Sequence, residues 1–314
     1  MLLSRHAENA FWLGRYTERV ESISRLLNVT EAFAADQDSN DAWAPILSVF
    51  SDEKAFAETG KKFEAANVAR FYLTDRNNPN SAAFALFMAK ENARALRHLI
   101  STEAWRQMSV FFDLIASVQK RRFAVSKLSE ICTAIREGSY TFRGVMAASG
   151  YRDEVWRFYE LGAALERADQ TTRLIDIKYF RFDRDDDDAA APPDVTWWNT
   201  LLRSASGYHA FQRRHSFNAD PEDAARFILF DPFLPHSVYH AAMTGFYGLE
   251  RLERDFRARP DAGVAAAEEA LRARIDNPPA HLRGRGLHRY IDALQREINT
   301  LANAINERYL SPAG

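Results

Sequence analysis

Apolar residues recur every three to four positions along most of this 314-residue chain, which is the spacing of one face of an α-helix. The first predicted helix runs from Ser4 to Ala35, with Phe11, Leu13 and Val20 among its apolar positions. No segment shows the period of two that indicates a half-buried strand. Glycine and proline number 13 and 11, and most of them lie between periodic segments. The pattern therefore predicts an all-α, multi-helix bundle with short connections.

Turn and cap residues divide the rest of the chain into further helices. Ser81 follows a turn rich in asparagine and is a favourable N-cap, and Ser101 or Thr102 can cap the next helix. Gly150 stands where a helix commonly ends in the left-handed conformation. The further predicted helices cover residues 42–50, 53–59, 64–73, 81–100, 102–120, 123–148, 153–180, 197–206, 208–215, 221–230, 238–258, 262–275 and 287–310.

An acidic segment interrupts this pattern at 182–195. Its consecutive aspartates repel one another, and its two prolines cannot continue a helix. We interpret 182–195 as a solvated acidic linker. The alternative is that the acidic run binds a basic partner or a cation.

Composition excludes several classes of protein. The formal net charge of −2 gives no whole-protein attraction to nucleic acid or to an anionic membrane. Cys132 is the only cysteine, which rules out an internal disulfide and a thiolate zinc cluster, and its apolar neighbours indicate a buried side chain. The charged first residues do not resemble a signal peptide, and no window approaches about 18 apolar residues. We expect a cytoplasmic protein that binds neither nucleic acid nor membrane.

The two halves of the chain contain similar segments. Residues 13–29, LGRYTERVESISRLLNV, align without a gap on residues 161–177, LGAALERADQTTRLIDI. A fainter similarity follows in the same order, where Pro79–Ser81 and Pro235–Ser237 each precede a predicted helix. The preserved order predicts an internal pseudo-repeat of a helical unit, with halves at about 1–150 and 151–314.

Helical geometry places the shared residues on one face of each helix. The first stripe carries Gly14, Glu18, Glu21 and Arg25, at positions i, i+4, i+7 and i+11. The second stripe carries Gly162, Glu166, Asp169 and Arg173. A glycine within a helix costs about 1 kcal/mol relative to alanine, so we expect another helix, such as the repeat partner, to approach this face closely.

The charged residues of the stripes allow three interpretations. Glu21 with Arg25, and Asp169 with Arg173, have the spacing and order of intrahelical ion pairs, which favours a structural charge network. The second interpretation is recognition of a substrate or partner peptide. The third is a metal or acid–base site formed by four converging carboxylates, those of Glu18, Glu21, Glu166 and Asp169.

Other residues carry weaker signals. Arg19 and Arg167 could clamp a carboxylate or phosphate, or pair on the helix surface. His236 and His240 have the one-turn spacing of metal ligands but lack the glutamate of a zincin motif, so we expect no cofactor. The basic segment 281–289 could bind an anion at a helix start. The pair at 197–198, two tryptophans, is either part of the core or an exposed anchor for a partner.

Ordered motifs resemble those of the bacterial α-E family, all-helical proteins named for a Glu-Arg motif. The resemblance covers nearly the whole chain and includes MLLSRHAEN (1–9), WLGRY (12–16), ER (18–19), NPNS (78–81), ENAR (91–94), STEAW (101–105), LERAD (165–169), LLRSASGY (201–208) and DPFLPHS (231–237). One departure is Ala163–Ala164, where the family often carries a charged or aromatic residue.

The resemblance implies a single α-E domain over 1–314 in a bacterial protein. It also implies a gene encoded beside ATP-grasp proteins and transglutaminase-like peptidases, and thus a peptide-ligation or peptide-modification system. We expect a non-catalytic accessory or scaffold protein that binds such partners, with Glu18, Arg19, Glu21, Arg25, Glu166, Arg167, Asp169 and Arg173 as its candidate binding residues. The alternative is an enzyme that uses the paired carboxylates, with or without a divalent metal, to form or hydrolyse an amide.

Overall fold

The computed structural model describes residues 2–35, 40–120, 124–182, 195–215 and 220–311. Within these ranges the chain forms 14 α-helices and no strand, which confirms the all-α fold class. None of the helices in this part of the chain is both long enough and apolar enough to cross a membrane.

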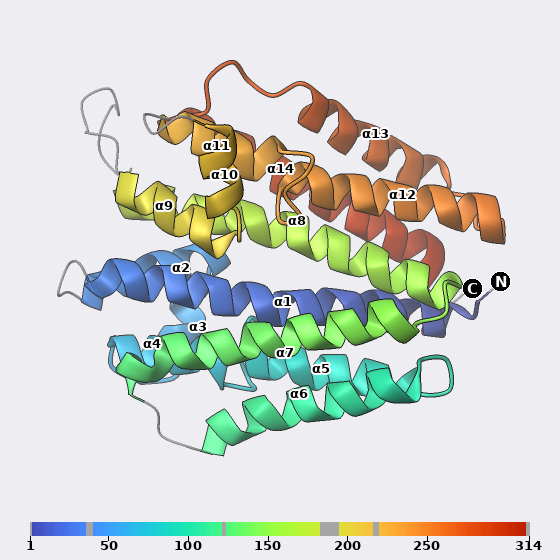
Figure 1. The fold of residues 1–314 in the computed structure, drawn as a ribbon, viewed down its shortest axis with the longest axis horizontal. Helices are drawn as coiled ribbons and strands as arrows, with labels where there is room; N and C mark the ends of the chain where they lie inside the picture. Colours follow the sequence, from blue (N-terminus) through green and yellow to red (C-terminus); the bar gives the residue numbers. More distant parts are fainter. Residues whose placement is uncertain (1, 36–39, 121–123, 183–194, 216–219, 312–314) are drawn as a thin grey trace.

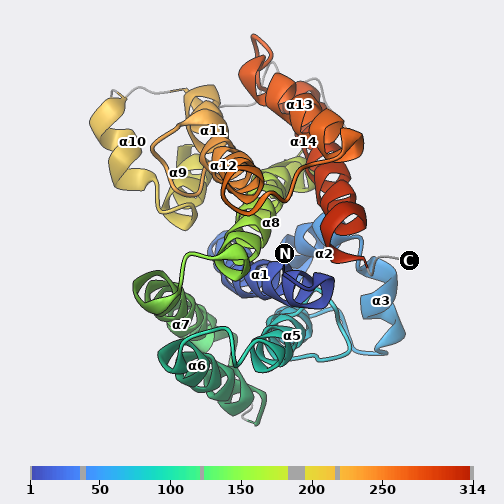
Figure 2. The ribbon, with the colours of Figure 1, turned by 90° about the vertical axis from the view of Figure 1, so that its right-hand side faces the viewer.

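Two long helices run side by side through the middle of the molecule, α1 (Ser4–Ala35) and α8 (Glu154–Phe182) (Figure 1). Viewed from the end, they separate two groups of helices (Figure 2). One group contains α5 (Ala82–Ala95), α6 (Thr102–Lys120) and α7 (Leu128–Ser149), of which α5 and α7 pack on α1. The other contains α12 (Val238–Phe256), α13 (Ala262–Asp276) and α14 (Gly284–Ile305), of which α12 and α14 pack on α8.

Shorter elements complete the two groups. They are the 3₁₀ turns η1 (Asn40–Trp43) and η2 (Val125–Lys127), the helices α2 (Ala44–Phe50), α3 (Glu53–Glu58), α4 (Ala65–Leu73), α9 (Val195–Ser204), α10 (Tyr208–Arg214) and α11 (Pro221–Phe230), and the π-helical turn η3 (Asn306–Leu310). The predicted acidic linker lies outside the described residues, except for its ends, which belong to α8 and α9.

Two serines cap helices at equivalent places in the two similar segments. The Oγ of Ser81 accepts a hydrogen bond from the N–H of Phe84 at 3.0 Å, which confirms the predicted cap of α5. Ser237 caps α12 in the same way, accepting from the N–H of His240 at 2.9 Å. Each serine hydroxyl also donates to the carbonyl six residues before it, and each therefore fixes the turn that leads into its helix.

The predicted bounds of two helices and the predicted conformation of Gly150 are wrong. The helix that begins after Ser81 ends at Ala95 rather than at residue 100, because the chain turns at Leu96. The helix predicted from residue 123 begins at Leu128, after η2. Gly150 is extended (φ −73°, ψ 132°) rather than left-handed. A Cβ at Gly150 would lie 2.6 Å from the carbonyl oxygen of Met146, so crowding, not a positive φ, explains this glycine.

The core contains the single cysteine and both adjacent tryptophans. Cys132 is fully buried, and burial raises the pKa of its thiol to about 12, as expected for a side chain that acts as a small hydrophobe. Trp197 and Trp198 are buried, and Trp197 stacks on Phe33 with 4.0 Å between ring centroids. The tryptophans therefore belong to the core and are not an exposed anchor.

Candidate functional site

The two Glu-Arg helices cross where their glycines meet. A Cβ on Gly14 would lie 2.0 Å from the carbonyl oxygen of Tyr159 on α8. A Cβ on Gly162 would lie 2.0 Å from the carbonyl oxygen of Phe11 on α1. Only a hydrogen atom fits at either position, so the glycines allow the two backbones to come into contact. The close approach predicted for this face is confirmed, and its neighbour is the helix that carries the similar segment.

Glu166 lies next to this crossing and is held by two arginines of α1. Arg19 donates to it at two points, with Nε 2.5 Å from Oε1 and Nη2 3.0 Å from Oε2. Arg15 adds a third bond, with its Nε 2.7 Å from Oε2. The side chain of Glu166 is fully buried. Two-point guanidinium–carboxylate pairing of this kind is among the strongest hydrogen bonding that proteins form.

Glu18 is held by the reciprocal pair. Arg167 of α8 donates to Glu18 with Nε 2.8 Å from Oε1 and Nη2 2.8 Å from Oε2. The glutamate of each Glu-Arg dipeptide therefore pairs with the arginine of the dipeptide on the other helix. The exchange is incomplete in one respect: Arg15 corresponds to Ala163, so among the described side chains of α8 only Arg167 pairs with Glu18. Arg143 of α7 approaches Glu18 instead, with its Nη2 3.7 Å from Oε2.

The remaining acids of the stripes form the predicted intrahelical pairs. Arg25 Nη2 lies 2.7 Å from Glu21 Oε1, and Arg173 Nε lies 2.9 Å from Asp169 Oδ2. Each arginine also donates to a backbone carbonyl of the helix beside it, Arg25 to Ser204 and Arg173 to Val49 at 2.9 Å. These bonds attach the ends of α9 and α2 to the central pair of helices.

Sequence reasoning missed Arg15 of α1 and three members of this network that lie outside the two central helices. Arg143 donates to Glu21, and the hydroxyl of Tyr140 lies 2.6 Å from Arg25 Nη2. His236 Nε2 lies 3.1 Å from the same nitrogen of Arg25. Tyr140 and Arg143 belong to α7, and His236 precedes α12. The spacing of His236 from His240 marked it only as a weak metal-ligand candidate, and no spacing or repeat marks Tyr140 or Arg143. Only the packing of α7 and α12 against α1 and α8 brings these residues to the acids.

The arginines keep the buried acids charged. Burial alone would raise the pKa of Glu18, but Arg167 and Arg143 outweigh it and hold the pKa at about 2. Burial acts against the charge of Glu166 in the same way, and Arg19 and Arg15 hold its pKa at about 2. The pKa of His236 is lowered well below its usual 6.5, first by burial and then by Arg25, so its imidazole is neutral at pH 7.

One part of the network has the composition of a metal site. Ligand atoms of Glu18, Glu21 and His236 lie within 4.8 Å of one another. Two guanidinium groups, those of Arg25 and Arg143, already contact the same acids and would repel a divalent cation. In the described residues, Glu166 and Asp169 are not part of this group, so the four carboxylates do not form one ligand set.

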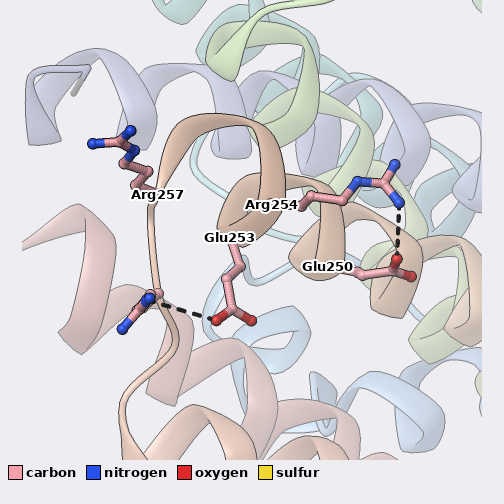
Figure 3. Close-up of a pocket in the computed structure, with 5 residues that line it drawn as sticks. Glu250, Glu253, Arg254 and Arg257 are labelled. Carbon is pink, nitrogen blue, oxygen red and sulfur yellow. Dashed lines mark hydrogen bonds and ion pairs between the residues drawn. The ribbon is translucent and has the colours of Figure 1, made fainter.

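Little space for a ligand remains beside the network. A cavity of about 10 Å³ is lined by Ser22, Arg25, Gln170, Thr171, Leu174, Ala205 and His236. That volume is about the space for one water molecule. A larger recess of about 600 Å³ lies at the end of α12, where Arg254 pairs with Glu250 and Arg259 with Glu253 (Figure 3). Its lining residues are all charged and most pair with one another.

A second charged cluster joins α8 to α14. His288 Nδ1 lies 2.7 Å from Asp176 Oδ1, and His288 Nε2 lies 3.5 Å from Asp292 Oδ2. Ligand atoms of these three residues also lie within 4.8 Å of one another. Burial raises the pKa of Asp176 to about 6, although the hydrogen bond with His288 opposes the rise.

The remaining candidates from the sequence, His240 and the basic segment 281–289, contact residues outside the central network. His240 Nδ1 lies 3.0 Å from the carbonyl oxygen of Pro232, whereas His236 contacts the central network. In the basic segment 281–289, Arg283 Nε lies 2.7 Å from Glu222 Oε2, and the N–H of Leu282 donates to Oε1 of the same carboxylate. The start of this segment is therefore anchored to α11.

The fold and the network define a class: an all-helical domain whose two central helices exchange buried Glu-Arg pairs. The chain belongs to the Alpha-E family, described as a predicted alpha-helical domain with a conserved ER motif, which it matches over residues 2–310. The dipeptides Glu18-Arg19 and Glu166-Arg167 are its two ER sequences in the central helices.

The chain is also similar to curated mycobacterial proteins. It is 24% identical over 290 residues to "Uncharacterized protein Rv2567" and "Uncharacterized protein MT2643" of Mycobacterium tuberculosis and to "Uncharacterized protein Mb2597" of Mycobacterium bovis. These matches cover 85% of this chain but only 31% of each relative, so the chain spans about a third of the length of the relatives it matches. No solved structure matches the chain.

Proposed function

We propose that this protein is a non-catalytic helical accessory or scaffold protein of a bacterial peptide-ligation or peptide-modification system. In this proposal it acts in the cytoplasm and binds ATP-grasp and transglutaminase-like partners. The identity of the partners comes from the resemblance to the α-E family. The role as scaffold comes from the site itself.

The reciprocal pairing of the two ER dipeptides supports this proposal most strongly. Arg19 and Arg167 each use two nitrogens on the glutamate of the opposite helix, so the motif binds itself. The adjacent cavity has room for about one water molecule. A motif used in this way fixes the relative position of two long helices. Partner binding then belongs to the surfaces that these helices hold in place.

The length of the relatives is consistent with such a role. In the three mycobacterial proteins the matching region is about a third of the chain, so a domain of this kind occurs there beside further sequence. Fusion in one organism and association in another are two ways of holding the same domains together. This supports a domain that works next to other protein domains.

Affinity purification from the native bacterium tests the proposal. We expect an ATP-grasp or transglutaminase-like protein to co-purify at near-stoichiometric amount, as identified by mass spectrometry. The same purification with the variant Glu130→Gln is the control for substitutions of the network acids. Glu130 has an exposed carboxylate, which pairs with Lys127 three residues before it. The control should recover the same partners. Recovery of neither class of partner would contradict the proposal.

The alternative is an enzyme that uses the paired carboxylates. The convergence of Glu18, Glu21 and His236 supports this alternative. It predicts turnover of an amide or peptide that is lost in Glu18→Gln or Glu166→Gln while the fold survives. Circular dichroism of the variants separates the two ideas. If the substitutions unfold the chain, the acids are structural and the enzyme proposal loses its support.

A further inference from the structure

The cluster of Asp176, His288 and Asp292 differs from the buried acids of the two Glu-Arg stripes. Glu18, Glu21, Glu166 and Asp169 each face at least one guanidinium group. Among the described side chains, no lysine or arginine lies within 4.0 Å of the carboxylate of Asp176 or Asp292. Two carboxylates therefore converge on one imidazole, and neither forms an ion pair with a described lysine or arginine.

The helical framework fixes the three side chains. His288 and Asp292 are four residues apart on α14 and so lie on one face of that helix. Asp176 lies on α8, against which α14 packs, and its residue is only 5% exposed. The side chain of Asp292 is 40% exposed, so the cluster reaches from the core to solvent. The exposed side of Asp292 is therefore the side from which a cation reaches the cluster.

The geometry points to a divalent transition-metal site, and we propose that Asp176, His288 and Asp292 bind an ion such as Zn²⁺ or Mn²⁺ between α8 and α14. One imidazole nitrogen and two carboxylate oxygens suit first-row divalent ions better than Ca²⁺ or Mg²⁺, which prefer all-oxygen sites. The three ligand atoms already lie within 4.8 Å of one another. Solvent on the side of Asp292 supplies the remaining ligands.

The ion would act as a clamp between distant parts of the chain. Asp176 and His288 are 112 residues apart in sequence, and a metal bound by both holds α14 on α8. Because the ligand set is complete only in the folded chain, metal binding stabilises the fold. This inference does not depend on the proposed partners.

Titration of the untagged full chain with Zn²⁺, after treatment with a chelator and dialysis, tests the site by calorimetry. We expect one ion per chain. We also expect the midpoint of thermal unfolding to rise by about 5 °C at a hundredfold excess over the dissociation constant. Mn²⁺ should compete, and Mg²⁺ at the same concentration should not. Failure to bind one Zn²⁺ per chain would overturn the proposal.

Substitutions test whether the ion binds at this cluster. Asp292→Asn and His288→Gln should each weaken Zn²⁺ binding at least about tenfold. Asp292 is partly exposed, so its variant should fold even if His288→Gln does not. His281→Gln is the matched control, since its imidazole is exposed and lies 3.9 Å from a single carboxylate, that of Glu222. Unchanged affinity in Asp292→Asn, or an equal loss in His281→Gln, would show that the ion binds elsewhere.

Discussion

Two groups of carboxylates lie along α8 in this molecule. One lies where α8 crosses α1, and the other where α8 contacts α14. At the first, arginines hold the pKa of Glu18 and Glu166 at about 2. At the second, burial raises the pKa of Asp176 to about 6, because a histidine rather than a guanidinium faces it. The three side chains are similarly buried. The partner, not the burial, therefore decides whether a core carboxylate stabilises the fold as a charged group.

Acid should act most strongly on the first region. The pKa of Glu18 and Glu166 is about 2 in the folded chain and 4.5 as the ordinary value. Because the folded pKa is lowered, the stabilisation is present above about pH 4.5 and is lost as the pH falls toward 2. Protonation of each carboxylate then lowers the free energy of unfolding by about 3 kcal/mol, and protonation of both lowers it by about 6 kcal/mol. Urea unfolding followed by circular dichroism between pH 7 and 2 measures this loss.

A variant without one charge pair separates this effect from general acid denaturation. Glu18→Leu with Arg167→Met removes both partners, and replacement of a whole buried pair by apolar groups is often close to neutral at pH 7. Its unfolding free energy should fall less steeply below pH 4.5 than that of the wild-type chain. Identical slopes in the two proteins would contradict the assignment of the pKa to this pair.

Removal of one charge alone should cost nearly as much at neutral pH. Glu166→Gln leaves Arg15 and Arg19 buried without their carboxylate, and the expected loss is about 4 kcal/mol of unfolding free energy. Chemical denaturation at pH 7 measures it. Glu58→Gln serves as the control, since Glu58 forms an exposed intrahelical pair with Lys54 and should change little. A loss no larger than that of the control would show that the network does not hold the two helices together.

The helix crossing offers the next largest effect. Gly14→Ala places a methyl group 2.0 Å from the carbonyl oxygen of Tyr159, so α1 and α8 must separate, at an expected cost of about 3 kcal/mol. Gly144→Ala in α7 is the matched control, because nothing lies within 4 Å of the new methyl group. That control should gain up to about 1 kcal/mol from helix propensity. Thermal unfolding of both variants decides the matter, and equal shifts would refute the close contact.

The second region should be the least sensitive. In the presence of a chelator, Asp176→Asn keeps an acceptor for His288 and removes a buried charge that forms no ion pair with a described arginine. We expect the unfolding free energy at pH 7 to change by less than about 1 kcal/mol. Chemical denaturation of Asp176→Asn and of Glu166→Gln under the same conditions compares the two losses directly. A loss as large as that of Glu166→Gln would mean that the two regions are stabilised in the same way.

Much of the fold could be predicted from periodicity and local capping. The bounds of α1 and α11 agree with the prediction, and Ser81 caps α5 as expected. These features depend on residues within one turn of a helix, so the local sequence contains the necessary information. The end of α5 at Ala95 was mispredicted, because the chain turns at Leu96, whereas Gly150 ends α7 as predicted but in an extended rather than a left-handed conformation. The duplication of a helical unit, with the division into halves, stays a prediction.

The sequence alone determined the helical class, the two Glu-Arg stripes and the intrahelical pairs of Glu21 with Arg25 and Asp169 with Arg173. Helical spacing determines those pairs before any tertiary contact forms. Only the tertiary structure decided that Arg19 and Arg167 exchange glutamates and that His288 meets Asp176. It also brought Arg143 of α7 to the acids of α1. These contacts join residues more than 100 positions apart, and their geometry depends on how whole helices pack, which no local pattern encodes.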